Sequence, residues 1–326
     1  MKLKEILDDK LFELYNNNIP QEIKTRIEEE LDIIIDEKIE YQYLIAYEIA
    51  KKVKSDNRIM IDRICGSSYI AYLLGITFVN PIEYCIVYEK GFKPITFDLE
   101  FAEDYFKTIF EYTKEVCKKY SITINNEEDL KGHNLYLNTY ELCSVLENLE
   151  TRTGKHRQDI DLKDEELYKY LIDENTTIFD ESEMKIATSL FNQEFIINNV
   201  NCVASVISLD RSTITDKLDI VNSIIYYPVY REAIYSFLIM AGLEKKLAYE
   251  IMNFIAKGKH RIKIYKETWE KYIFIMKEHG IEDEYINCCS KIQYLFSKAY
   301  SINRAIIYVW LTYYKMNYLK VYEEVF

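Results

Sequence analysis

A chain of 326 residues with 49% hydrophobic and 29% charged side chains has the composition of a folded globular protein, not of a disordered one. Its formal net charge of −13 argues against a general polyanion binder, so any contact with nucleic acid must come from local basic segments. Seven cysteines without a Cys-x-x-Cys pair and four scattered histidines support neither a disulfide framework nor a zinc site.

Residues that interrupt helices are scarce, with 8 Gly and 4 Pro. This scarcity predicts an α+β fold that is mainly α, with a few short strands. No apolar run reaches the roughly 18 residues that a membrane helix needs. The N-terminus has the pattern of an amphipathic helix and not of a signal peptide, so we expect a cytoplasmic protein without membrane contact.

Residues 1–57 have the apolar spacing of helices, and residues 59–64 that of a short strand. The turn Cys65-Gly66-Ser67-Ser68 then leads into a helix at residues 69–74. Such a turn can offer backbone N–H groups to a phosphate, although serine at a helix start is more often a plain N-cap. After Asn80-Pro81 we expect another short strand at residues 84–88.

The most informative stretch is Thr96-Phe97-Asp98-Leu99-Glu100-Phe101, which follows Lys93-Pro94. Its alternation of apolar and acidic side chains predicts a half-buried strand with Asp98 and Glu100 on one face. Two neighbouring carboxylates repel each other unless they meet a cation, usually a metal ion. A solvent-facing edge strand with two ordinary acids is the alternative.

A helix is expected at residues 103–120, and residues 135–149 are helical or mixed. The loop that follows, residues 151–157, is basic. Residues 158–185 are strongly acidic, and we interpret residues 158–227 as a peripheral segment of uncertain role.

From about residue 228 the pattern changes to long helices, expected at residues 230–240, 247–257, 267–278, 283–296 and 302–320. Between Ile251 and Lys266 the chain carries no acid but a run of basic side chains that begins at Lys257. In so acidic a protein this run is the best candidate for contact with phosphates. A solvated helix end, whose lysines interact with the helix dipole, is the alternative.

In their order, these motifs resemble the α subunit of PolC-type bacterial DNA polymerase III, a C-family DNA polymerase. The resemblance covers roughly residues 10–120 and 228–326. It rests on five segments: residues 63–68 with Asn80-Pro81, the metal strand at residues 96–101, Thr153-Gly154-Lys155-His156, Lys257-Gly258-Lys259, and residues 291–299.

The resemblance implies a truncated, degenerate polymerase with a small mixed-sheet, nucleotidyltransferase-like palm at residues 1–227 and an all-helical fingers-like domain at residues 228–326. It assigns catalysis to Asp98 and Asp219, and a metal site to Asp98 and Glu100. The expected nucleotide-binding residues are Arg63, Gly66, Ser67, Ser68, Lys291 and Lys298. The expected DNA-binding residues are Arg152, Lys155, His156, Lys257, Lys259 and Arg261.

The departures from the family pattern concern the chemistry. The family has two aspartates on the metal strand, and the first is Thr96 here. Threonine carries no charge and is a poor Mg²⁺ ligand, so a Mg²⁺ site is possible but degraded. The glycine-serine loop has lost its first Gly-Ser pair. The zinc-binding insertion expected after Asn80 is absent, so no zinc is expected.

Three functions remain open from the sequence. The first is a catalytically impaired module that binds DNA, nucleotides or replication proteins, and accompanies or interferes with an active polymerase. The second is a minimal Mg²⁺-dependent polymerase or nucleotidyltransferase that uses Asp98, Glu100 and Asp219. The third is a scaffold that binds only proteins, which the net charge of −13 favours.

Overall fold

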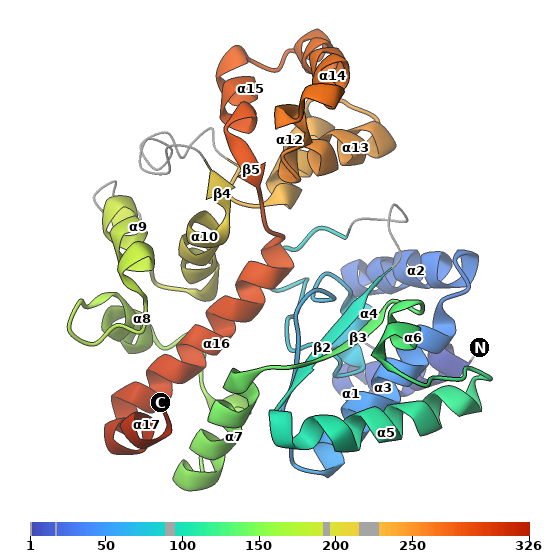
Figure 1. Ribbon diagram of the computed structural model, residues 1–326, viewed down its shortest axis with the longest axis vertical. Coiled ribbons are helices and arrows are strands. Elements are labelled where there is room, and N and C mark those ends of the chain that lie inside the picture. The colour runs from blue at the N-terminus through green and yellow to red at the C-terminus, as the bar shows by residue number, and fades with distance from the viewer. Residues whose placement is uncertain (1, 17, 89–94, 192–195, 215–227) are drawn as a thin grey trace. The chain divides into compact units, whose positions relative to one another are not determined.

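The computed structural model describes residues 2–16, 18–88, 95–191, 196–214 and 228–326 (Figure 1). The chain forms two compact units, one made of residues 1–159 and 317–326, the other of residues 160–316. Helices dominate both units, and the largest sheet has three strands in mixed orientation. The predicted fold class, α+β and mainly α, is confirmed.

The first unit surrounds a small sheet with helices. Its strands are β1 (Met60–Asp62), β2 (Phe97–Phe101) and β3 (Leu135–Thr139). Its helices are α1 (Lys2–Tyr15), α2 (Gln21–Asp36), α3 (Glu40–Ser55), α4 (Tyr69–Leu73), α5 (Glu103–Lys119), α6 (Glu127–Lys131), α7 (Glu141–Thr153) and α17 (Leu319–Val325).

Strand β2 is the centre of the sheet, antiparallel to β1 and parallel to β3. Its three apolar side chains, Phe97, Leu99 and Phe101, are fully buried, as the alternating sequence predicts. The Tyr43 ring of α3 packs on Phe97 in a T-shaped arrangement, with 5.1 Å between the ring centroids. Helices α3 and α5 pack against each other within the same unit (Figure 1). Burial of this core fixes which face of β2 carries the acids.

One expectation in this unit needs correction. Residues 84–88, predicted as a strand, continue the turn that begins at Pro81. The Ile86 N–H donates to the Pro81 carbonyl (2.8 Å), and Cys85 has a φ of 49°, which prevents an extended strand. Residues 135–149, predicted as helical or mixed, divide into β3 and the start of α7.

The described residues of the second unit form helices and one short strand pair, β4 (Thr213–Ile214) antiparallel to β5 (Ile292–Tyr294). Its helices are α8 (Glu165–Ile172), α9 (Glu181–Phe191), α10 (Val200–Arg211), α12 (Arg231–Met240), α13 (Lys245–Ala256), α14 (Lys266–Glu278), α15 (Asp283–Ser290) and α16 (Lys298–Asn317).

The helix predicted at residues 283–296 ends at Ser290, because Ile292–Tyr294 pairs with β4. The Leu295 N–H also donates to the Ala256 carbonyl at the end of α13 (2.9 Å). Figure 1 shows α12, α13, α14 and α15 gathered into one helical body within this unit.

Within the segment interpreted as peripheral, the described residues form α8, α9 and α10, with fully buried Leu171, Leu190 and Val203. The predicted domain boundary between residues 227 and 228 adjoins residues 215–227, which lie outside the described part, and it stays a prediction. Among the helices that the structure describes, none combines the length and apolar character needed to cross a membrane.

Candidate functional site

Both predicted acids on β2 face the side chain of Arg63. One oxygen of Asp98 lies 3.8 Å from Nη1 of Arg63, and one oxygen of Glu100 lies 3.6 Å from Nε of the same guanidinium. Arg63 directly follows β1, and its backbone N–H donates to the Asp98 carbonyl (3.0 Å). The antiparallel pairing of β1 with β2 therefore places a positive charge beside both carboxylates.

A neutral side chain from β3 completes this cluster. Nδ2 of Asn138 donates to the second oxygen of Asp98 at 2.6 Å. Partial burial raises the pKa of Asp98, while Arg63 and this hydrogen bond act in the opposite direction. The cluster is thus a pair of carboxylates beside one guanidinium, with an amide that donates a hydrogen bond to Asp98.

A further acid lies at the end of β1. Asp62 is fully buried, and burial raises its pKa to about 7. One of its oxygens accepts a hydrogen bond from the Cys65 N–H at 2.9 Å. The negative charge of Asp98 adds to the increase of the pKa. Sequence reasoning missed Asp62, since its environment depends on the pairing of β1 with β2.

These residues fit a two-metal site poorly. Mg²⁺ prefers an octahedron of oxygen ligands at about 2.1 Å, with at least one or two carboxylates directed at it. Here the positively charged Arg63 guanidinium lies beside Asp98 and Glu100, where a metal ion would have to bind. Thr96, half-exposed just before β2, adds no negative charge. A Mg²⁺ ion at these acids would have to displace Arg63. Asp219, the other predicted catalytic residue, lies outside the described residues.

The serine-rich turn before α4 is engaged by a buried carboxylate from α2. One oxygen of Glu30 accepts from the Tyr69 N–H (2.8 Å), and the other accepts from the Ile70 N–H (3.1 Å) and the Ser68 hydroxyl (2.6 Å). Arg26, one helical turn earlier, bonds the same carboxylate at 2.7 Å. The backbone donors that could hold a phosphate are therefore bonded to Glu30 in this structure.

The same turn has the geometry of an ordinary N-cap. The Ser68 hydroxyl accepts from the Ala71 N–H at 3.0 Å. The Arg26 guanidinium also donates to the Ser67 carbonyl, next to Gly66. Nucleotide binding by Gly66, Ser67 and Ser68 stays a prediction. The signal for Glu30 in the sequence was its spacing of four residues from Arg26, but an exposed pair would have the same spacing.

The segment predicted as a basic loop, residues 151–157, begins within α7, which extends to Thr153, and it is held by contacts within the same unit. Arg152 pairs with Glu324 of α17, and Nζ of Lys155 donates to the Asp159 carbonyl (3.0 Å). His156 lies 3.5 Å from Glu150. The structure thus separates the three predicted DNA-binding side chains among different partners, and their role stays a prediction.

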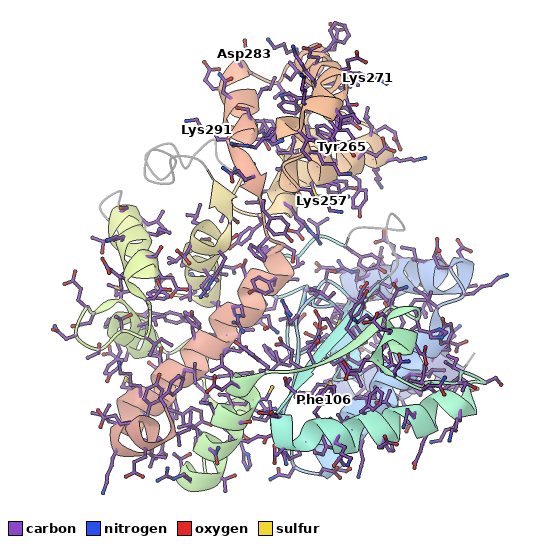
Figure 2. The ribbon with its side chains drawn as sticks, viewed as in Figure 1. Phe106, Lys257, Tyr265, Lys271, Asp283 and Lys291 are labelled. Carbon is purple, nitrogen blue, oxygen red and sulfur yellow. The ribbon has the colours of Figure 1, made fainter. Side chains whose placement is uncertain are left out.

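In the second unit, the predicted DNA-binding residues lie on the turn after α13, where Lys257 and Arg261 are exposed and Lys259 is half-buried. Lys257 ends α13, Gly258 adopts a φ of 61°, and Lys259 and Arg261 belong to the short 3₁₀ turn that follows. Nζ of Lys259 lies 5.7 Å from the centre of the Tyr265 ring. Figure 2 shows Lys257, Tyr265 and Lys271 on the helical body described above. Cations and an aromatic ring therefore share one surface segment.

The predicted nucleotide-binding lysines of this unit have different environments. Lys291 caps the end of α15. Lys298 begins α16, where its N–H donates to the buried carboxylate of Glu232 (2.8 Å) and its ammonium lies 5.9 Å from the centre of the Tyr230 ring.

One oxygen from each of Asp180, Glu183 and Asp210 lies within 4.8 Å of the others. Asp180 and Glu183 cap the start of α9 reciprocally, each accepting from the backbone N–H of the other (2.9 and 3.0 Å). Arg211 lies 3.5 Å from Glu183 and 3.8 Å from Asp210. Capping and ion pairing account for this cluster without a metal.

Comparison with known proteins identifies relatives. Residues 1–131 match the family model for the "Bacterial DNA polymerase III alpha NTPase domain". Over this N-terminal part, the chain is similar to the α subunit of bacterial DNA polymerase III. It is 38% identical over 92 residues to the PolC-type DNA polymerase III of Lactococcus lactis, and 37% identical over 92 residues to that of Halalkalibacterium halodurans. Each match covers 28% of this chain and only 6% of the relative.

The match over residues 1–131 confirms, for that part of the chain, the resemblance read from the sequence. The matched residues 1–131 include β1, β2 and the turn before α4, and therefore contain the cluster of Arg63, Asp98 and Glu100. The fingers-like assignment of residues 228–326 lies beyond this family match and stays a prediction.

Proposed function

We propose that this PolC-like chain is a catalytically impaired module that binds DNA or nucleotides and accompanies or interferes with an active polymerase. The observation that carries the proposal is the position of Arg63, whose guanidinium lies within 4 Å of both Asp98 and Glu100. The resemblance to the family adds that Thr96 stands where a metal-binding aspartate is expected.

Two-metal catalysis requires anionic oxygens that bridge two cations, which in turn hold the attacking and leaving oxygens. At the palm of this chain one expected bridging carboxylate is missing. The two carboxylates that remain, Asp98 and Glu100, share the Arg63 guanidinium. Its N–H groups can donate hydrogen bonds, but it cannot coordinate an attacking oxygen as a metal ion does. Such a cluster keeps the sheet intact without supplying the chemistry of polymerisation.

Retained binding is supported by the second unit. Lys257, Arg261 and Lys263 are exposed within one short segment of an otherwise acidic protein. Clustered cations attract phosphates, and the adjacent Tyr265 offers a ring on which a base can stack.

Primer extension with Mg²⁺ or Mn²⁺ tests the catalytic part of the proposal. We expect no extension above that of Asp98→Asn, which controls for contaminating polymerase. Extension by the natural chain that Asp98→Asn abolishes would refute impairment and favour the minimal polymerase. A Thr96→Asp, Arg63→Ala double variant is expected to gain Mg²⁺ binding in calorimetry, because it restores one carboxylate and removes the competing cation.

Fluorescence anisotropy with primer-template DNA tests binding. We expect salt-dependent binding that weakens in Lys257→Gln, Arg261→Gln, with the slope of log K against log salt reduced by about 1–2. Lys245→Gln, Lys246→Gln removes the same charge from the opposite end of α13 and serves as the control. Absence of salt-dependent binding by the natural chain would contradict the proposal and favour a scaffold that binds only proteins.

A further inference from the structure

A second basic site lies within the first unit, in a cavity of about 570 Å³. Its walls come from α1, α3, the turn after α4, the end of α7 and the loop that follows. None of its lining residues belongs to the cluster of Arg63, Asp98 and Glu100. The volume lies within the range of pockets that hold small ligands, about 300–1,000 Å³.

The residues that line the cavity carry more cations than carboxylates, although the protein is acidic and several of these cations pair with carboxylates beside the cavity. Among the described residues that line it, Glu150 is the one carboxylate. The lining also contains five cationic side chains: Lys10, Lys51, Lys54, Arg58 and Arg157. Cations that converge in a hollow raise the local potential more than the same charges spread over a convex surface.

The local sequence explains why the lysines meet here. Tyr47, Lys51 and Lys54 are four and three residues apart on α3, so they lie along one face of that helix. Lys10 reaches the cavity from α1, which packs on α3. The buried faces of these two helices therefore determine where their exposed lysines converge.

The arginines of the wall are held more firmly than the lysines. Arg58 bonds Glu147 at 3.0 Å and also pairs with Asp104, and Arg157 bonds Glu150 at 2.8 Å. These contacts fix the two guanidinium groups in place. The cavity thus has a preorganised cationic wall.

The lysine contacts are weaker. Lys10 pairs with the largely exposed Glu13, and Nζ of Lys51 lies 3.8 Å from Glu48. Surface pairs of this kind contribute little to stability. A ligand with several negative charges can therefore recruit the ammonium groups of Lys10, Lys51 and Lys54 together.

We infer that this cavity binds a small polyphosphate anion, such as the triphosphate group of a nucleotide or free tripolyphosphate. Several linked phosphates match several separated cations, whereas a single phosphate can reach only some of them. The inference does not depend on the proposed function, because it involves neither the β2 acids nor the second unit.

Calorimetric titration of the full chain with sodium tripolyphosphate, at low ionic strength and without Mg²⁺, tests the inference. We expect saturable binding to one site. The double variant Lys51→Gln, Lys54→Gln is expected to weaken it about tenfold or more, because two charge-assisted contacts are lost. Lys118→Gln, Lys119→Gln removes the same charge from the exposed end of α5 and is expected to change the affinity less than about twofold.

Thermal unfolding of both double variants establishes that they are folded. Orthophosphate is expected to bind at least about tenfold more weakly than tripolyphosphate. ATP that binds more tightly than tripolyphosphate would identify a nucleotide as the ligand, and equal affinity would identify the phosphate chain alone. Absence of saturable binding to the natural chain, or equal weakening in both double variants, would overturn the inference.

Discussion

Replacement of Glu30 by glutamine should strongly destabilise the first unit. The buried carboxylate accepts four hydrogen bonds, with Arg26 and the Tyr69 N–H on one oxygen, and the Ser68 hydroxyl and the Ile70 N–H on the other. Glutamine replaces one oxygen with an NH₂ group, which would face two donors. Since hydrogen bonds to a charged group contribute about 1.5–3 kcal/mol each, we expect a loss of roughly 3–5 kcal/mol.

The assay must report on the unit that contains Glu30. Both tryptophans, Trp269 and Trp310, lie in the second unit, so tryptophan fluorescence is unsuitable. Hydrogen exchange followed by mass spectrometry resolves peptides that cover α4, whose amides should exchange faster by about two orders of magnitude or more. Glu28→Gln, at an exposed position of α2, is the matched control. Equal exchange in the two variants would refute the role assigned to Glu30.

Two other predictions concern single buried positions. Because the folded pKa of Asp62, about 7, exceeds its unfolded value of about 3.9, its contribution to stability is complete at low pH and is lost as pH rises through 7. Between about pH 5 and pH 8, the free energy of unfolding measured in urea should fall by about 2–3 kcal/mol more for the natural chain than for Asp62→Asn. The same dependence on pH in both proteins would contradict this. Gly258→Ala should lower stability by about 1–2 kcal/mol more than Gly280→Ala in thermal unfolding. Both glycines have positive φ, but only at Gly258 would the added Cβ lie 2.2 Å from the Gln293 carbonyl oxygen; equal effects would show that this contact relaxes freely.

Local sequence was sufficient for much of the fold. The alternation at residues 97–101 predicted β2 with its correct limits, and the same period put Asp98 and Glu100 on one face. The apolar spacing in residues 103–120 predicted α5 to within one residue. These features depend on periods of two or 3.6 residues, which can be read within a short window. The motifs that resemble the polymerase family could be recognised for the same reason, since each is also a short stretch of sequence.

The tertiary structure alone decided what those residues meet. Arg63 reaches Asp98 because β1 pairs antiparallel with β2, and Glu30 reaches the turn before α4 across 38 residues of chain. Lys51 lines a cavity together with His156 for a similar reason. Each contact joins segments that are distant in the chain, and the local sequence of one segment does not indicate the other. The sequence therefore determined the fold class, the central strand β2, helices such as α5 and the resemblance of the N-terminal part to a known family. The partners of the charged side chains depended on how the buried faces packed.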